Sequence, residues 1–135
     1  MIGLNPDRDT PTWTVALDRI LSIEYVTDTY QSSEIDWNDY FYDIIGVTRP
    51  ADKEVETIKL EVTKEQAPYI ETKPLHPSQK TYWEDDKLIV EIEVIPNYEL
   101  ETLILSFGEK VRVLSPKKLS EIISKRVSLA SRNYL

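Results

Sequence analysis

The sequence contains no cysteine and a single histidine among its 135 residues. Without cysteine, the chain cannot form a disulfide, a zinc–thiolate site, an iron–sulfur cluster or a thiol nucleophile. It has three glycines, at positions 3, 46 and 108, and this wide spacing excludes the glycine-rich loops that bind phosphate groups. No apolar run approaches the ~20 residues that cross a bilayer, and the N-terminus lacks the pattern of a signal peptide. These absences predict a cytoplasmic protein that has no metal or other cofactor and does not contact a membrane.

Acidic residues outnumber basic ones by 24 to 16, which gives a formal net charge of −8. This excess argues against a protein whose whole surface binds phosphate backbones. The charges are unevenly spread, because residues 109–135 hold seven basic residues and two acidic ones, whereas the remaining residues hold nine and twenty-two. Such a split predicts that one part of the chain docks on another, or that two copies associate.

The first 34 residues contain two short β-prone runs, at 12–17 and 21–26, and a linker at 31–34. Two short strands do not make a stable unit alone, so this region is predicted to need partners that the sequence does not obviously supply.

A helix is predicted after residue 35, with Asp36 as its N-cap and Gly46 as the residue that ends it. Its apolar residues follow the spacing of one buried stripe, namely Trp37, Tyr40, Phe41, Ile44 and Ile45. So much aromatic area on one short helix has to pack against a sheet or another chain. Trp37, Phe41 and Ile44 are therefore the predicted interaction residues.

From residue 55 to residue 114 the sequence alternates strand and helix patterns in the order β-α-β-β-α-β. This order predicts an α+β fold with a ferredoxin-like unit, in which a four-stranded antiparallel sheet carries two helices on one face. The two short β-prone runs, a strand remnant, precede that unit, as does the helix after residue 35, which connects them to it. A last helix follows it, with a stripe of Leu119, Ile122, Ile123, Val127 and Ala130, and either covers the free face of the sheet or docks on another subunit.

Catalytic and metal-binding patterns are weak. His76 lies between two prolines near Ser78, without the Gly-x-Ser-x-Gly pattern of a nucleophile elbow, and is predicted to order its loop, as is Gln79. The acidic groups at 36, 39 and 43 and at 84–86 lack the spacing of a calcium loop and fit a solvated face and a hairpin tip. The sequence therefore predicts no catalytic residue, no metal site and no enzyme.

Several motifs carry a family resemblance. The run Pro74-Leu-His-Pro-Ser-Gln79, with Ala67-Pro-Tyr69 before it and Leu105-Ser-Phe-Gly108 and Val111-Arg-Val-Leu-Ser-Pro116 after it, resembles the C-terminal extension of WYL-domain transcriptional regulators. Ala16-Leu-Asp-Arg-Ile20 is similar to the closing segment of the WYL domain. The resemblance divides the chain into a WYL remnant (1–30), a linker with a connector helix (31–54) and the C-terminal extension domain (55–135).

The resemblance implies a regulatory, ligand-sensing and dimerisation module of a bacterial transcription regulator. In that family a winged helix-turn-helix binds DNA, an Sm-like WYL barrel senses a ligand, and the extension helps the protein dimerise. The helix-turn-helix and the Trp-Tyr-Leu signature are missing here, so DNA would be contacted only through a missing N-terminal domain. Arg19 is the implied ligand-binding residue, the implied effector of the intact parent is a nucleotide or nucleic acid, and a homodimer is expected. A stand-alone protein–protein interaction module is the alternative.

Overall fold

The computed structural model describes residues 1–5, 7 and 10–135, with the backbone alone described at residues 10 and 11. These residues form two compact units, Met1–Glu34 and Ile35–Leu135. The first unit contains a sheet of two strands and the second a sheet of four. No helix in the described part of the chain is long and apolar enough to span a membrane.

The first unit is built on a hairpin. Strands β1 (Ile2–Asn5) and β2 (Thr10–Thr14) pair antiparallel, with Gly3 opposite Trp13, and a short 3-10 helix, η1 (Leu17–Arg19), follows. The prediction of a strand over 21–26 is wrong, because this segment forms no strand and all its side chains are exposed. A two-stranded hairpin is too small to hold a further strand in place without a core beneath it.

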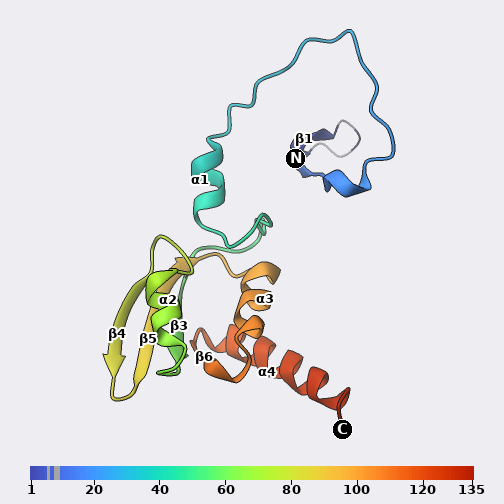
Figure 1. Ribbon diagram of the computed structural model, residues 1–135. Helices are drawn as coiled ribbons and strands as arrows, with labels where there is room; N and C mark the ends of the chain where they lie inside the picture. Colours follow the sequence, from blue (N-terminus) through green and yellow to red (C-terminus); the bar gives the residue numbers. More distant parts are fainter. Residues whose placement is uncertain (6, 8–9) are drawn as a thin grey trace. The chain divides into compact units, whose positions relative to one another are not determined.

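The second unit contains the predicted ferredoxin-like fold (Figure 1). Its strands are β3 (Glu56–Val62), β4 (Lys80–Glu84), β5 (Lys87–Val94) and β6 (Val111–Ser115). They lie in the order β4-β5-β3-β6, and every neighbouring pair is antiparallel. Helix α2 (Ala67–Thr72) connects β3 to β4, and α3 (Tyr98–Ser106) connects β5 to β6. The element order and the antiparallel pairing confirm the fold expected from the sequence.

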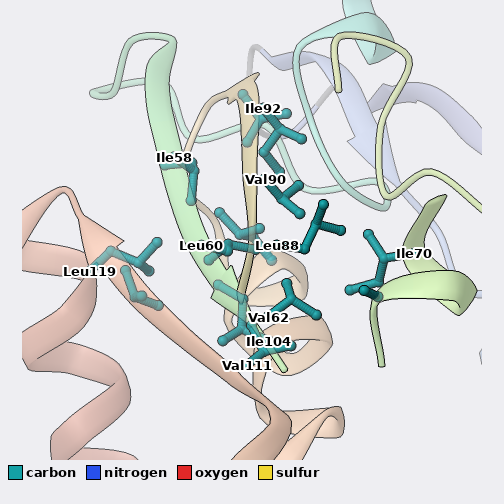
Figure 2. Packing of buried hydrophobic residues seen from close by; sticks show 14 residues of the cluster. Ile58, Leu60, Val62, Ile70, Leu88, Val90, Ile92, Ile104, Val111 and Leu119 are labelled. Carbon is teal, nitrogen blue, oxygen red and sulfur yellow. The ribbon is translucent and has the colours of Figure 1, made fainter. Parts of the chain in front are cut away.

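The core lies on the face of the sheet that the helices cover (Figure 2). The register places Leu60 opposite Val90 and Val62 opposite Leu88, so the alternating apolar residues of β3 and β5 share one face. Each of these four side chains is completely buried. The helices, β6 and the last helix contribute the rest of the cluster, namely Ala67, Ile70, Leu100, Ile104, Val111, Val113 and Leu119.

The last helix, α4 (Lys117–Arg132), packs beside α3 and β6. Leu119 at its N-terminal end joins the core, and Arg126 Nη1 donates to Glu101 Oε2 of α3 at 2.9 Å. The guanidinium of Arg126 also lies 4.9 Å from the ring centre of Tyr98. The prediction that this helix covers the free face of the sheet is therefore wrong, because Leu119 packs in the core on the opposite face. Ser115-Pro116 has the sequence of an N-cap followed by proline in the first turn, but the helix begins at Lys117 and no side chain caps it.

Helix α1 (Trp37–Tyr42) is shorter than its apolar stripe. Its predicted N-cap is confirmed, since Asp36 Oδ1 accepts from the backbone N of Asn38 at 2.9 Å and of Asp39 at 3.3 Å. The helix ends four residues before Gly46, whose positive φ of 78° closes the turn that follows.

Candidate interaction surfaces

Asn97 holds the loop between α1 and β3 (residues 43–55, called the connector from here on) against the sheet unit. Asn97 precedes its helix as a residue typical of an N-cap, and its Oδ1 accepts from the backbone N of Leu100 at 2.8 Å, so it caps α3. Its Nδ2 donates to the backbone O of Ile45 and to that of Thr48, both at 2.8 Å. The side chain is 2% exposed. One buried amide therefore caps a helix and fixes a loop that lies about fifty residues earlier in the sequence.

Glu99 makes a second attachment to the connector. Its Oε1 accepts from Thr48 Oγ1 at 2.7 Å, from Thr48 N at 3.1 Å and from Val47 N at 3.4 Å. Burial alone would raise the pKa of Glu99. The hydrogen bonds from Thr48 and Val47 have the larger combined effect and lower this pKa below its usual range. A Cβ at Gly46 would lie only 2.6 Å from Glu99 Cγ. The connector therefore approaches this carboxylate as closely as a glycine permits.

His76 joins the loop before β4 to the end of α1. Its Nε2 donates to the backbone O of Tyr42 at 2.5 Å, and its Nδ1 accepts from Ser78 N at 3.2 Å. Ser78 Oγ lies 2.7 Å from Nδ1 and accepts from the backbone N of Glu93 at 2.9 Å. This hydrogen-bond pattern assigns the ring proton to Nε2. Both ring nitrogens are thus occupied by contacts that order the loop.

Gln79 completes the attachment of the same loop. Its Oε1 accepts from Leu75 N at 2.9 Å, and its Nε2 donates to the backbone O of Ile70 in α2 at 3.1 Å. Gln79 thus orders its loop, as predicted, through two hydrogen bonds to the backbone. Among the described residues there is no group of three or more acidic or histidine side chains that could hold a metal ion.

The aromatic side chains of α1 form a cluster at the surface of the second unit. The rings of Trp37 and Phe41 stack with their centres 6.1 Å apart, and Tyr40 meets each of them edge-on, at 5.6 Å and 5.0 Å. These three side chains are half-buried, whereas Ile44 is 5% exposed. Of the predicted interaction residues, the structure thus leaves Trp37 and Phe41 available to a partner and buries Ile44.

The charges around this aromatic cluster are unequal. Arg49 packs over the Tyr40 ring at 5.4 Å and pairs with Asp43 at 3.3 Å. Asp36 and Asp39, which precede Asp43 in the sequence, are exposed and form no ion pair with any described residue. Asp39 is two residues from both Trp37 and Phe41, so the helical turn places it on the side of α1 opposite their rings.

The apolar stripe of α4 continues past the core. Leu119 is buried and Ile123 packs against the core, but Val127 is 51% exposed and Ala130 is exposed. Spacings of three and four residues place these side chains on one side of the helix. The predicted stripe is confirmed, and within the second unit only its first half is covered.

The same end of α4 is basic. Residues 122–135 contain Lys125, Arg126 and Arg132 and no acidic residue. Arg126 is paired with Glu101, while Lys125 and Arg132 have no ion-pair partner in the described structure. Lys125 and Arg132 lie two and five positions from Val127, on the side of α4 away from its apolar stripe.

The free face of the sheet is covered by paired charges. Lys59 Nζ lies 2.8 Å from Glu91 Oε1 and 3.1 Å from Tyr82 Oη, and Arg112 pairs with Glu61 at 2.8 Å. The hydrogen bond to Glu91 makes the largest contribution to raising the pKa of Lys59, and the hydrogen bond to Tyr82 makes the second largest. The bond to Lys59 in turn lowers the pKa of Glu91. This face has neither a large apolar area nor an excess of positive charge to attract a phosphate-rich ligand.

Two further places bear on ligand binding. Arg19 is exposed at the end of η1, directly after Asp18, and no ion pair ties it to another described residue. A cavity of about 480 Å³ lies where residues 52–56 and Pro96 meet the first turns of α4, with Lys53, Glu101 and Lys118 among its charged lining residues. No pattern in the sequence points to this cavity, because its walls come from three distant segments.

The comparisons with known proteins identify the second unit. The family model of the WCX domain matches residues 54–130, which is more than half of the chain. The match begins just before β3 and ends in α4, so it contains the whole four-stranded unit. No curated protein matches the chain. WCX domains are found in WYL-associated regulators. The chain belongs to the WCX domain family.

Proposed function

We propose that this chain is the regulatory, ligand-sensing and dimerisation module of a bacterial WYL-type transcriptional regulator. The observation that carries the proposal is the WCX match over residues 54–130, because it covers every strand and helix of the ferredoxin-like unit. The motifs at 16–20 and 74–79 that resemble WYL regulators support the same assignment.

The module acts by binding rather than by catalysis. Its single histidine uses both ring nitrogens in structural hydrogen bonds to Tyr42 and Ser78. A general base needs a nitrogen that faces the reacting group. The exposed features of the described residues, namely the aromatic rings of α1 and the uncovered apolar stripe of α4, instead have the composition of contact surfaces.

Dimerisation is supported by the uncovered half of the α4 stripe and by the separation of charge along the chain. Closed two-fold dimers are the commonest way in which proteins cover such surfaces. Charges in solution are screened beyond ~8 Å at physiological salt, so apolar burial has to dominate the contact.

Sedimentation velocity of the full chain at micromolar concentration, at low and at high salt, tests this part of the proposal. We expect a dimer under both conditions. A monomer throughout would refute dimerisation and favour the alternative module.

Ligand sensing is proposed at Arg19, whose planar guanidinium suits a phosphate group. Titration calorimetry with a nucleoside triphosphate and with a short oligonucleotide tests it, on the wild type and on Arg19→Ala. We expect the substitution to abolish binding of whichever probe binds. Equal binding by both proteins would place the site elsewhere, and the cavity beside Pro96 is the next place to examine.

A stand-alone protein–protein interaction module is the second candidate. The half-buried rings of Trp37 and Phe41 favour it, since aromatic residues are enriched at interfaces. The sedimentation experiment separates the two candidates, because the regulatory module is expected to associate with itself.

A further inference from the structure

We propose that the outer edge of β4 pairs with the β4 edge of a second copy, antiparallel and across a two-fold axis, so that two four-stranded sheets become one continuous sheet. This contact is separate from the uncovered end of α4. It goes beyond the proposed dimerisation, because it joins copies that already associate through α4 into larger assemblies.

Strand β4 forms an unprotected edge of the sheet. In the order β4-β5-β3-β6 it has a strand on one side only, and all five of its residues are exposed. Its register with β5 continues from Lys80 to Glu84 without a bulge, and the strand contains no proline. Bulges and prolines are two of the features by which natural proteins prevent an edge strand from pairing with another chain. The β4 edge is therefore able to accept a further strand.

The backbone groups of β4 point alternately to its two sides. Glu84 and Lys87 flank the two-residue turn of the β4–β5 hairpin, so Glu84 directs its N–H and C=O towards β5. The same direction recurs at every second residue, which places the backbone groups of Tyr82 and Lys80 against β5 as well.

Thr81 and Trp83 lie between these residues and direct their N–H and C=O away from β5. The N–H of Glu93, an even number of positions after the start of β5, donates to Ser78 Oγ just before β4 at 2.9 Å, as this alternation requires. No strand of the second unit lies on the outer side of β4. A second β4 would therefore meet two donors and two acceptors along this edge.

The charges of β4 are complementary to those of a second β4. Lys80, Tyr82 and Glu84 share the free face of the sheet, because alternate residues of a strand share a face and Tyr82 bonds to Lys59 there. When two β4 strands run antiparallel with Tyr82 at the axis, Lys80 of each copy lies directly opposite Glu84 of the other. Opposite charges in this position stabilise strand pairing. Neither residue forms an ion pair with a described residue of its own chain, so this pattern favours a second copy as the occupant.

The other face of β4 adds apolar contact. Trp83 pairs with Leu88 of β5, which is completely buried, yet Trp83 is 48% exposed since no strand lies on its other side. The two-fold pairing places Thr81 of the second copy opposite Trp83 and brings the two Trp83 rings to diagonal positions, within reach of each other. On the free face, Tyr82 meets its own copy at the axis. The pairing therefore removes aromatic surface from water.

The opposite edge of the sheet lacks this complementarity. Two β6 strands paired around Val113 would place Arg112 opposite Leu114, without an opposite charge. Helix α4 packs beside β6, at the far edge from β4, so a copy bound to β4 leaves the α4 stripe accessible. A pair of five-residue strands is much smaller than the ~800 Å² per partner of a standard interface. We therefore expect this contact to form at higher concentration than the contact through α4.

Charge reversal in the full chain tests the pairing. In sedimentation equilibrium, we expect the wild-type mass at near-millimolar concentration to rise above its value at micromolar concentration. Glu84→Lys places two cations opposite each other at both ends of the contact, and Lys80→Glu places two anions there. Either variant should raise the dissociation constant of this second step about tenfold. Asp28→Lys, at an exposed position in the first unit, makes the same change of charge as Glu84→Lys and should leave the constant unchanged.

Mixing the two charge variants separates a direct contact from a general effect of charge. In a pair made of one Glu84→Lys copy and one Lys80→Glu copy, one end of the contact keeps the native Lys80 and Glu84. The other end has the two charges exchanged but still opposite. We therefore expect an equal mixture, unlike either variant alone, to recover most of the wild-type association.

Amide exchange followed by NMR reports the strand pairing itself. The N–H groups of Thr81 and Trp83 should exchange quickly at low concentration and slowly at high concentration, whereas that of Tyr82, which faces β5, should exchange slowly at both. Thr81→Pro removes an outward donor and no bond to β5, so it should prevent the second step of association. Circular dichroism checks that this variant keeps its fold.

The possible failures are distinguishable. A wild-type mass that stays constant up to near-millimolar concentration would overturn this inference and leave the proposed dimerisation through α4 intact. Association that neither Glu84→Lys nor Thr81→Pro weakens would also overturn it, because the contact would then lie on another surface. A chain that is monomeric at micromolar concentration but associates through β4 at high concentration would refute the proposed dimerisation and uphold this inference.

Discussion

Residues 21–26 and residues 87–94 both place apolar side chains at alternate positions, yet only the second segment forms a strand. Leu88, Val90 and Ile92 of β5 are completely buried, and β5 pairs with β3 on one side and β4 on the other. Leu21, at the start of the first segment, is 100% exposed. Alternation thus specifies which face of a strand is apolar, but neighbouring strands and a covering layer decide whether the strand forms.

The largest effect should separate these two regions by one substitution made in each. Leu60→Ala removes a completely buried side chain from β3 and is expected to lower the free energy of unfolding by about 2–5 kcal/mol. Leu21→Ala removes the same atoms from an exposed side chain and should change it by less than about 0.5 kcal/mol. Chemical denaturation of both variants measures the difference. Comparable losses would show that residue 21 is buried in solution.

A smaller effect should show whether the connector is part of the stable second unit. Gly46→Ala puts a methyl group against Glu99 at a positive φ and breaks the bonds to Val47 and Thr48, at an expected cost of about 3 kcal/mol. Gly108 also has a positive φ, but its Cβ position is open. Gly108→Ala is therefore the matched control and should cost only about 1 kcal/mol. Equal costs in thermal or chemical unfolding would mean that the connector is not held at Glu99.

The smallest effect depends on pH. Because the pKa of Glu99 is lowered in the folded state, its contribution is fully present above its unfolded pKa and is lost as the pH falls through the folded value. At neutral pH, Glu99→Gln should lower the free energy of unfolding by about 1 kcal/mol. The gap to the wild type should close below pH ~4, near the ordinary carboxylate range. A gap that stays constant with pH would show that the carboxylate charge does not hold the connector.

Much of the second unit could be predicted because each element carries its own local signal. Asp36 and Asn97 precede their helices as caps, and the Leu60 and Val90 positions follow strand alternation. The bonds that join elements have no such signal. Glu99 meets Thr48 across about fifty positions, and His76 meets Tyr42 across thirty-four, through backbone groups that every residue possesses.

The candidate surfaces were predictable to different degrees. The helical spacing of Trp37 and Phe41 predicted the aromatic face of α1, but the burial of Ile44 depends on packing that spacing does not reveal. The stripe of α4 was visible in the sequence, whereas the point where its cover stops, between Ile123 and Val127, depends on packing that helical spacing does not reveal.

The central claim is that the WCX unit contains the stable fold and that its uncovered helix end, rather than residues 21–26, makes the contact between copies. Hydrogen–deuterium exchange of the full chain, followed by mass spectrometry at concentrations below and above dimer formation, tests it most directly. We expect strong protection of 56–62 and 87–94 at every concentration, unprotected amides in 21–26, and protection of 127–132 that rises with concentration. Protection that rises in 21–26 while 127–132 stays unchanged would contradict the account.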